Sequence, residues 1–309
     1  MFMSVVRHPM QTYRWMQFLK SGPLPADIVR SPLRFLAKIH RPYLSNQMDC
    51  PGRLKLLVDH YESLSSAGLG PLVRQAAQAP VSLGTFAGKS GALYEIQLSA
   101  LEQRQDGELV LRLVTRMTCV YTAAFVISLH DSPPRITLGS LTGMLATDRD
   151  IGIKQVTRDL YGCRPKDLMI TLVRDIGDCL GCRDVVLVGN RNRIPDHALR
   201  VCKKSSDYDR NWQEMQARMR DDGDFELPCA TTAADAADSP LLQPTRRSLL
   251  VDFIRQMVRI RTGAQGAAFD HAPVAPPAPA SQPYQQDPEK MIDHRHLQPD
   301  YVHLKQSNL

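Results

Sequence analysis

Residues 153–168 read Ile-Lys-Gln-Val-Thr-Arg-Asp-Leu-Tyr-Gly-Cys-Arg-Pro-Lys-Asp-Leu, and residues 184–190, after an amphipathic run, read Asp-Val-Val-Leu-Val-Gly-Asn. Gly162 can adopt a backbone conformation that other residues resist. Pro165 suits the first turn of a helix, where no backbone donor is needed. Leucine or isoleucine recurs every fourth position from 168 to 180 and so lines one face of a helix. The pattern predicts a helix, a tight turn, a second helix and a short buried strand.

The middle of the chain has the composition of β-strands. Runs rich in β-branched and aromatic residues occupy residues 94–98, 109–114, 119–129 and 136–141. Their short connections favour an antiparallel meander. Upstream, residues 53–65 place apolar side chains on one helical face. The order predicts a mixed α/β (α+β) fold, with a largely antiparallel sheet and a helical N-terminal extension.

Two cations are fixed in the predicted turn. Arg164 and Lys166 flank a helix N-terminus, where N–H groups without partners favour an anion. The pair indicates a site for a phosphate, a carboxylate or a coenzyme; the alternative is a helix start with two solvated cations. Asn190 and Arg193 follow the predicted strand at 184–188, and ligands of α/β sheets bind beyond the carboxyl ends of strands. These four residues are the candidate ligand-binding residues, and the sequence leaves open whether the two loops share a pocket.

The turn also carries a resemblance. Tyr161-Gly162-Cys163-Arg164-Pro165-Lys166, ahead of a long apolar helix, resembles the central signature of the VirK/YbjX family of bacterial proteins. Other elements agree in order: Arg41-Pro42-Tyr43, Arg53 followed by His60-Tyr61, residues 136–143, Val188-Gly189-Asn190, Asp207-Tyr208-Asp209 with Trp212, and Phe225-Glu226-Leu227-Pro228. The chain departs from the family at Thr142, where a Gln is expected.

The resemblance implies a domain over residues 35–262, preceded by an extension at 1–34. It implies an association with virulence, envelope integrity or resistance to antimicrobial peptides, and no particular reaction. Residues 263–309 are rich in Ala, Pro and Gln and lack apolar periodicity. We expect that segment to be a disordered tail, since it cannot bury enough surface to offset its ordering entropy.

The chain of 309 residues carries a net charge of +6, which favours anionic partners such as nucleic acid or acidic lipid. Its longest nearly apolar run, residues 119–129, is far below the ~18 residues of a membrane span. Residues 1–6 are too short for the apolar core of a signal peptide. We therefore expect a cytoplasmic protein, with peripheral attachment at the inner membrane as a variant. The basic amphipathic helix predicted at residues 245–260 would lie on an anionic membrane or dock on the domain.

The other motifs give weaker evidence of a functional site. Cys179 and Cys182 form a Cys-x-x-Cys pair at a helix end, the wrong polarity for a lowered thiol pKa, and a zinc site would need two more ligands. No metal site is expected. His60 stands alone, and a lone histidine is more often a structural residue than a catalyst. The sequence contains no Walker loop, no Gly-x-Gly-x-x-Gly and no His-Glu-x-x-His, and no specific nucleic-acid motif.

Two functions remain. The order of meander, helix, cationic turn, helix and strand resembles the coenzyme A half of the GCN5-related acetyltransferases, in which such a turn holds the pyrophosphate. This acyltransferase hypothesis requires parallel strands that separate beside the turn, and only on it is a coenzyme A thioester the expected cofactor. The turn lacks the second glycine of that family, so side chains would hold more of the anion. The other hypothesis is a non-catalytic factor that binds an anionic membrane surface, nucleic acid or an envelope protein. Neither assigns a catalytic residue.

Overall fold

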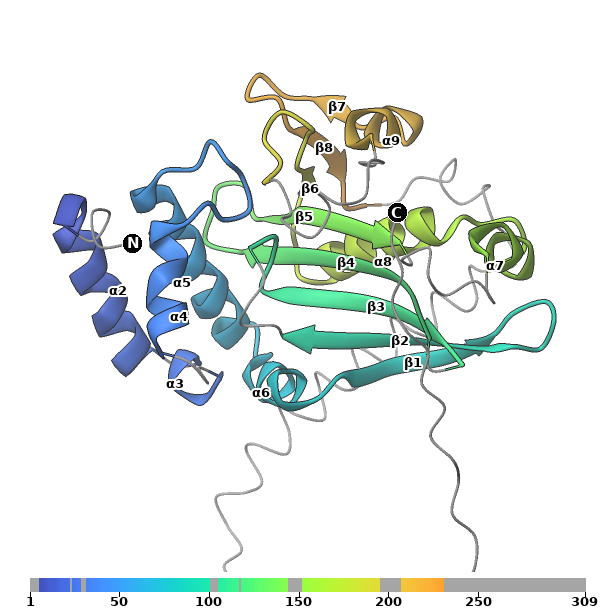
Figure 1. Cartoon of the computed structure of the whole chain (residues 1–309), viewed down its shortest axis with the longest axis horizontal. Coiled ribbons are helices and arrows are strands. Elements are labelled where there is room, and N and C mark those ends of the chain that lie inside the picture. The colour runs from blue at the N-terminus through green and yellow to red at the C-terminus, as the bar shows by residue number, and fades with distance from the viewer. Residues whose placement is uncertain are drawn as a thin grey trace, which may run out of the picture. The chain divides into compact units, whose positions relative to one another are not determined.

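An eight-stranded sheet forms the centre of the computed structural model (Figure 1). The structure describes residues 6–22, 24–28, 32–100, 105–116, 118–143, 152–194 and 207–230. The strands are β1 (Val81–Ala87), β2 (Leu93–Ala100), β3 (Leu109–Thr115), β4 (Thr118–Ser128), β5 (Arg135–Gly143), β6 (Asp184–Leu187), β7 (Arg218–Met219) and β8 (Phe225–Pro228). The helices are α2 (Pro9–Ser21), α3 (Pro25–Ile28), α4 (Pro32–Leu36), η1 (Ala37–His40, a 3₁₀ turn), α5 (Cys50–Ser66), α6 (Gly70–Gln78), α7 (Ile153–Asp159), α8 (Pro165–Cys179) and α9 (Tyr208–Glu214).

The sheet runs in the order β1-β2-β3-β4-β5-β6-β8-β7. Strands β1 to β5 follow one another as antiparallel neighbours. Strand β6 then pairs parallel to β5, and the crossover that a parallel pair needs is supplied by α7 and α8. Strands β8 and β7 complete the sheet as antiparallel neighbours beyond β6.

The helices cover the sheet with apolar faces. Helix α8 packs against β3, β4, β5 and β6, while α5 packs against β4 and α6 against β2. The buried face of α8 consists largely of aliphatic side chains, which are Leu168, Met169, Ile170, Leu172, Val173 and Ile176. Burial of such side chains, each contributing about 1.5–3 kcal/mol, is the main term that holds the helix on the sheet.

The helices before α5 join the same core through aromatic side chains. The Trp15 ring is fully buried, and its Nε1 donates a hydrogen bond to the Phe35 carbonyl oxygen at 3.0 Å. The rings of Phe18 and Phe35 stack on Trp15, each at 5.7 Å between centroids, and both contact Tyr61 of α5. Helix α2 is therefore anchored by one face.

The predicted fold class is confirmed: the fold is mixed α/β with a largely antiparallel sheet and helices ahead of it. Strand β1 lies outside the predicted strands, because Gly84 interrupts its alternation and shifts its register with β2. The helix expected at residues 245–260 and the tail at 263–309 lie outside the described residues. The domain limits after residues 34 and 262 stay predictions. No helix in the described ranges is long and apolar enough to cross a membrane.

Candidate functional site

Strands β5 and β6 separate on the side of the sheet that faces the cationic turn. Their parallel register runs from Arg135 opposite Asp184 to Leu138 opposite Leu187, and the Val188 N–H still donates to the Leu138 carbonyl at 3.1 Å. Strand β5 continues to Gly143, whereas β6 ends at Leu187. The acyltransferase hypothesis required such a separating pair.

Helix α9 fills the gap between the two strands. The Tyr208 hydroxyl donates to the Leu141 carbonyl oxygen at 2.8 Å and accepts from the Leu141 N–H at 2.9 Å. The indole Nε1 of Trp212 donates to the Val188 carbonyl oxygen at 3.0 Å. Both side chains are buried, and Figure 1 shows α9 beside β7 and β8. Tyr208 and Trp212 thus supply hydrogen-bond partners for backbone groups of Leu141 and Val188 that do not pair with a neighbouring strand.

The cationic turn has the backbone that its sequence predicts. Tyr161 and Gly162 take left-handed φ angles of 56° and 89°, and the Gly162 N–H donates to the Thr157 carbonyl at 2.8 Å, which ends α7. Pro165 then starts α8, with Arg164 as the N-cap residue. An arginine side chain has no hydrogen-bond acceptor. It cannot cap the helix as Ser, Thr, Asp or Asn would. The first turn contains one acid, Asp167, whose Oδ2 lies 3.6 Å from Arg164 Nε.

A carboxylate from α9 meets both candidate cations. Glu214 Oε2 accepts hydrogen bonds from Arg164 Nη1 at 2.8 Å and from Lys166 Nζ at 3.0 Å. Lys166 Nζ also donates to Asn211 Oδ1 at 2.7 Å. The hydrogen bond from Lys166, with that from Arg164, lowers the pKa of Glu214 to about 2. The pair therefore holds an anion within the fold itself.

The other two candidates lie at the opposite end of α9. The Asn190 side chain donates to Asp207 Oδ1 at 2.8 Å and accepts from the Tyr208 N–H at 3.0 Å, so it helps to start the helix. The Arg193 guanidinium carbon lies 4.0 Å from the centre of the Tyr208 ring. The structure thus brings all four candidates to α9, with Arg164 and Lys166 at its end and Asn190 and Arg193 at its start.

A cavity of about 600 Å³ opens at the start of α8. Its lining comprises Tyr121, Ile153, Lys154, Thr157, Arg158, Gly162, Arg164, Pro165 and Lys166. Four of these residues are cations and none is an acid. Tyr121 and Ile153 add apolar surface, and burial raises the pKa of the Tyr121 hydroxyl to about 12, so it stays protonated. The cavity suits a ligand with an anionic part and an apolar part.

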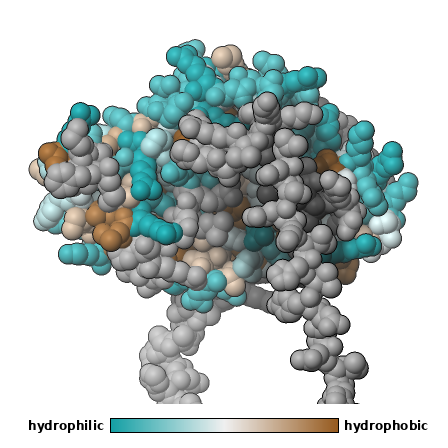
Figure 2. Space-filling view, in the orientation of Figure 1, coloured by the Kyte–Doolittle hydropathy of each residue, from teal (hydrophilic) through white to brown (hydrophobic). Residues whose placement is uncertain are grey.

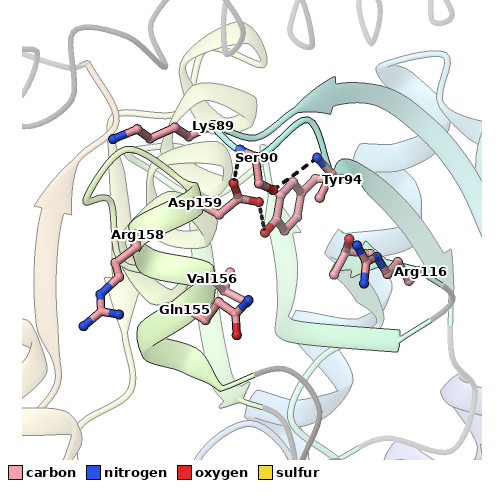
Figure 3. Close-up of a pocket in the computed structure, with 10 residues that line it drawn as sticks. Lys89, Ser90, Tyr94, Arg116, Gln155, Val156, Arg158 and Asp159 are labelled. Carbon is pink, nitrogen blue, oxygen red and sulfur yellow. Dashed lines mark hydrogen bonds between the residues drawn. The ribbon is translucent and has the colours of Figure 1, made fainter.

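A second cavity, of about 430 Å³, lies on the other side of α7 (Figure 3). Asp159 points toward the β1–β2 hairpin there, where it accepts from the Ser90 N–H at 2.5 Å and from the Tyr94 hydroxyl at 2.8 Å. Burial alone would raise the pKa of Asp159, but these hydrogen bonds outweigh it and lower that pKa. Arg158 lines both cavities, and in Figure 3 it points away from Tyr94. Asp159 thus pins α7 to the hairpin.

A buried carboxylate that the sequence did not single out lies under the N-terminal helices. Glu108 is 3% exposed and accepts hydrogen bonds from Lys38 Nζ at 2.5 Å, from the Tyr43 hydroxyl at 2.6 Å and from the Tyr61 hydroxyl. His60 lies against Tyr61, and burial lowers its pKa to about 4. Tyr43, His60 and Tyr61 belong to the motifs that carry the family resemblance, which was the one available signal. The two tyrosine hydroxyls bind the Glu108 carboxylate, whereas His60 Nδ1 accepts from the Ile127 N–H at 3.0 Å and its buried Nε2 has no hydrogen-bond partner among the described residues.

The Cys-x-x-Cys pair does not have the properties of a reactive site. Burial raises the pKa of Cys179, and it raises the pKa of Cys182 to about 12, so neither thiol favours the thiolate. Among the described residues, no three His, Cys, Asp or Glu side chains gather as a metal ion would require.

Comparison with known proteins gives a family. The family model described as "Protein of unknown function (DUF535)" matches residues 2–248. The chain belongs to this family. The VirK/YbjX family is the DUF535 family, so the resemblance inferred from the cationic turn and its companion motifs is confirmed. No protein with a curated description matches this DUF535 chain.

Solved structures resemble the DUF535 chain only weakly. The cAMP-binding acyltransferase from Mycobacterium smegmatis is matched at 10% identity and a TM-score of 0.34, over 68% of this chain and 61% of that one. A point mutant of the same acyltransferase is matched at 8% identity and a TM-score of 0.35, over 67% and 60% of the two chains. The chain thus spans about 60% of the length of these structures, and the similarity is too weak to support a shared activity.

Proposed function

We propose that this DUF535 protein binds a phosphorylated ligand of the coenzyme A thioester class at the start of α8, and that it is an acyltransferase. The observation that carries the proposal is the position of the four-cation cavity. It opens at the N-terminus of α8, and its lining residue Tyr121 pairs with Gly143 of β5, beyond the last residue of β5 that pairs with β6. A helix start attracts phosphate, and lysine and arginine add charge-assisted hydrogen bonds.

The Glu214 carboxylate supports an anion site and also competes with the ligand. It lies on Arg164 and Lys166, where a phosphate of the ligand would lie. A phosphate carries more charge and more acceptor oxygens than one carboxylate. It can therefore replace Glu214 at these cations. Lys154 and Arg158, from α7, line the same cavity and would take further phosphate oxygens.

A thermal-shift titration of the whole chain with coenzyme A and acetyl-coenzyme A tests this proposal. Ligand at one hundred times its dissociation constant should stabilise the protein by about 2.7 kcal/mol, which is about 5–10 °C in Tm for a domain of this size. Arg164→Ala and Lys166→Ala should each weaken binding by about tenfold or more, since a hydrogen bond to a charged group is lost. Arg183→Ala is the matched control, because Arg183 is an exposed cation beyond the opposite end of α8.

Glu214→Gln separates a ligand site from a purely structural ion pair. If Glu214 competes with the ligand, this variant should bind coenzyme A more tightly than the wild type. If Arg164 and Lys166 only hold α9 in place, the variant should lose stability and gain no affinity. Acyl transfer is then tested by mass spectrometry of candidate amine acceptors incubated with acetyl-coenzyme A, since a transferred acetyl group adds a fixed mass.

The wider role implied by the family resemblance is a second proposal. It covers virulence, envelope integrity, resistance to antimicrobial peptides, and a cytoplasmic location with contact to the inner membrane. The resemblance in the ordered set of motifs supports it. Deletion of the gene should lower the survival of the bacterium in a cationic antimicrobial peptide, and the Arg164→Ala variant should fail to restore survival if the α8 site underlies the role. Full restoration by that variant would separate the role from the site.

A further inference from the structure

The net charge of the chain is concentrated at one end. Residues 1–48 contain seven Lys or Arg residues and one Asp, a net charge of +6. The whole chain also carries +6, so residues 49–309 balance 31 cations against 31 acids. Lys38 is buried against Glu108, whereas five other cations of the segment are exposed, namely Arg7, Arg14, Lys20, Arg34 and Arg41. Charge asymmetry of this kind is typical of binding to nucleic acid or to a membrane.

Helix α2 presents apolar side chains to solvent from this basic segment. Its buried face, with Trp15 and Thr12, packs on α5 and the other N-terminal helices. On the opposite face, Met10 is 61% exposed and Tyr13 is 57% exposed. Val6 lies ahead of the helix and is 63% exposed. Met10 and Tyr13 lie three positions apart on α2, so they form one ridge that points away from the core, while the non-helical His8 separates Val6 from the helix.

Cations flank this ridge. Arg7, Arg14 and Lys20 are all exposed. At 100° per residue along α2, Arg14 lies on one side of the ridge and Lys20 lies near the other, while Arg7 precedes the helix. Leu33 on α4 is 74% exposed, and Arg34, which follows it in the sequence, is also exposed. Figure 2 shows hydrophobic and hydrophilic atoms side by side at the end of the molecule that carries α2. An apolar ridge edged with cations has the chemistry of a helix that lies in the interface of an anionic bilayer.

We propose that the outward face of α2 docks this protein on a membrane surface that contains anionic phospholipid. The cations face the headgroups, and the Met10 and Tyr13 side chains enter the boundary between headgroups and acyl chains. Exposed methionine favours this partner over nucleic acid, because a phosphate backbone offers no apolar phase to bury it. Trp15 already anchors α2 in the fold, so docking requires little further ordering of the helix. The inference does not depend on ligand binding at α8.

Flotation of the full chain with phosphatidylcholine vesicles, made with and without phosphatidylglycerol, tests the docking surface. The protein should float with the anionic vesicles, remain unbound with the neutral ones, and dissociate as salt shortens the range of the charges. Arg7→Gln/Arg14→Gln/Lys20→Gln should weaken binding by about fivefold per cation, or about one hundredfold. Met10→Gln/Tyr13→Gln should weaken binding without altering the net charge.

The matched control removes three cations elsewhere. Lys55→Gln/Arg183→Gln/Arg218→Gln alters side chains that are 74%, 76% and 78% exposed, and it should bind the anionic vesicles nearly as well as the wild type. Equal weakening by this control would overturn the proposal, because attraction would then depend on charge alone. If the Met10→Gln/Tyr13→Gln variant binds the anionic vesicles as tightly as the wild type, the proposed contact of these side chains with the membrane is wrong. Nucleic-acid binding without vesicle binding would also overturn the proposal. Thermal melts of each variant confirm that the fold is intact.

Discussion

Replacing Lys38 by methionine should destabilise the fold by an amount that depends on pH in an unusual direction. Lys38 and Glu108 are 7% and 3% exposed, and their Nζ and Oε1 atoms lie 2.5 Å apart. Lys38→Met keeps most of the side-chain volume but leaves the Glu108 carboxylate buried, with two tyrosine hydroxyls as its remaining partners. Breaking a buried ion pair costs about 3–5 kcal/mol. For a domain of this size that lowers Tm by about 6–20 °C.

The pH dependence follows from the pKa of Glu108. In the wild type, burial is the largest single influence and would raise this pKa. The charge of Lys38, the interaction with His60 and the hydrogen bonds from Lys38 and Tyr43 together outweigh burial and lower the pKa below its ordinary value. The group therefore stabilises the fold above its ordinary pKa, and that contribution is lost as pH falls. In Lys38→Met, burial dominates and we expect the pKa to lie above its ordinary value. The folded variant then binds the extra proton, so its deficit should shrink as pH falls and grow as pH rises.

Urea unfolding near pH 5 and near pH 7 measures the free energy of unfolding that this argument needs. The deficit of Lys38→Met relative to the wild type should be smaller at the lower pH. Lys55→Met is the control, because Lys55 is 74% exposed in its pair with Asp131 and should cost under about 1 kcal/mol. Lys38→Met/Glu108→Gln should recover part of the loss, since no unpaired buried charge remains. A deficit below about 1 kcal/mol, or one that is equal at both pH values, would refute the reasoning.

Three further predictions concern stability. Gly139→Ala should destabilise the fold by about 3 kcal/mol or more in urea unfolding, because the new Cβ would overlap the Asp106 carbonyl oxygen. The control is Gly152→Ala, whose Cβ would meet no atom within 4 Å and which should unfold like the wild type. Tyr208→Phe should cost about 1–3 kcal/mol in the same assay, since the Leu141 N–H and carbonyl both lose a buried partner, and Tyr13→Phe, at an exposed site, should be neutral. Burial lowers the pKa of His60 to about 4, so this side chain binds a proton more readily in the unfolded chain. The free energy of unfolding should therefore fall by up to about 3 kcal/mol as pH falls from about 6.5 to about 4. His60→Gln should remove this pH dependence.

Local patterns predicted most of the elements but few of their contacts. The four strands of the meander and the helices at α5, α7 and α8 have strong apolar periodicity, which depends only on neighbouring residues. Strand β7 has two residues, too few for any pattern. The contacts of Glu108 join positions 70, 65 and 47 residues apart, so no spacing in the sequence marks that residue. Tertiary packing alone decides which acid is buried among which donors.

The candidate site shows the same division between local and distant information. The helix start and its two cations follow from Gly162, Pro165 and their neighbours, which are adjacent in sequence. Glu214 comes from a short helix 48 and 50 residues away, and an exposed glutamate there resembles any solvated charge. The sequence therefore predicted an anion site but could not predict the anion that the fold supplies.

Helix α9 links the two halves of the proposed site. Its last residue, Glu214, lies on the cations of α8, and its first residue, Tyr208, bonds the edge of β5 where the parallel strands separate. A ligand phosphate that replaces Glu214 would remove two of the hydrogen bonds that hold the end of α9, while Tyr208 and Trp212 keep its buried face in place. The affinity of the site thus depends on the difference between the binding free energy of the ligand and that of the Glu214 carboxylate at the same cations. The ligand must bind Arg164 and Lys166 more strongly than a carboxylate that is already tethered there, and this favours a multiply charged phosphate over a single carboxylate.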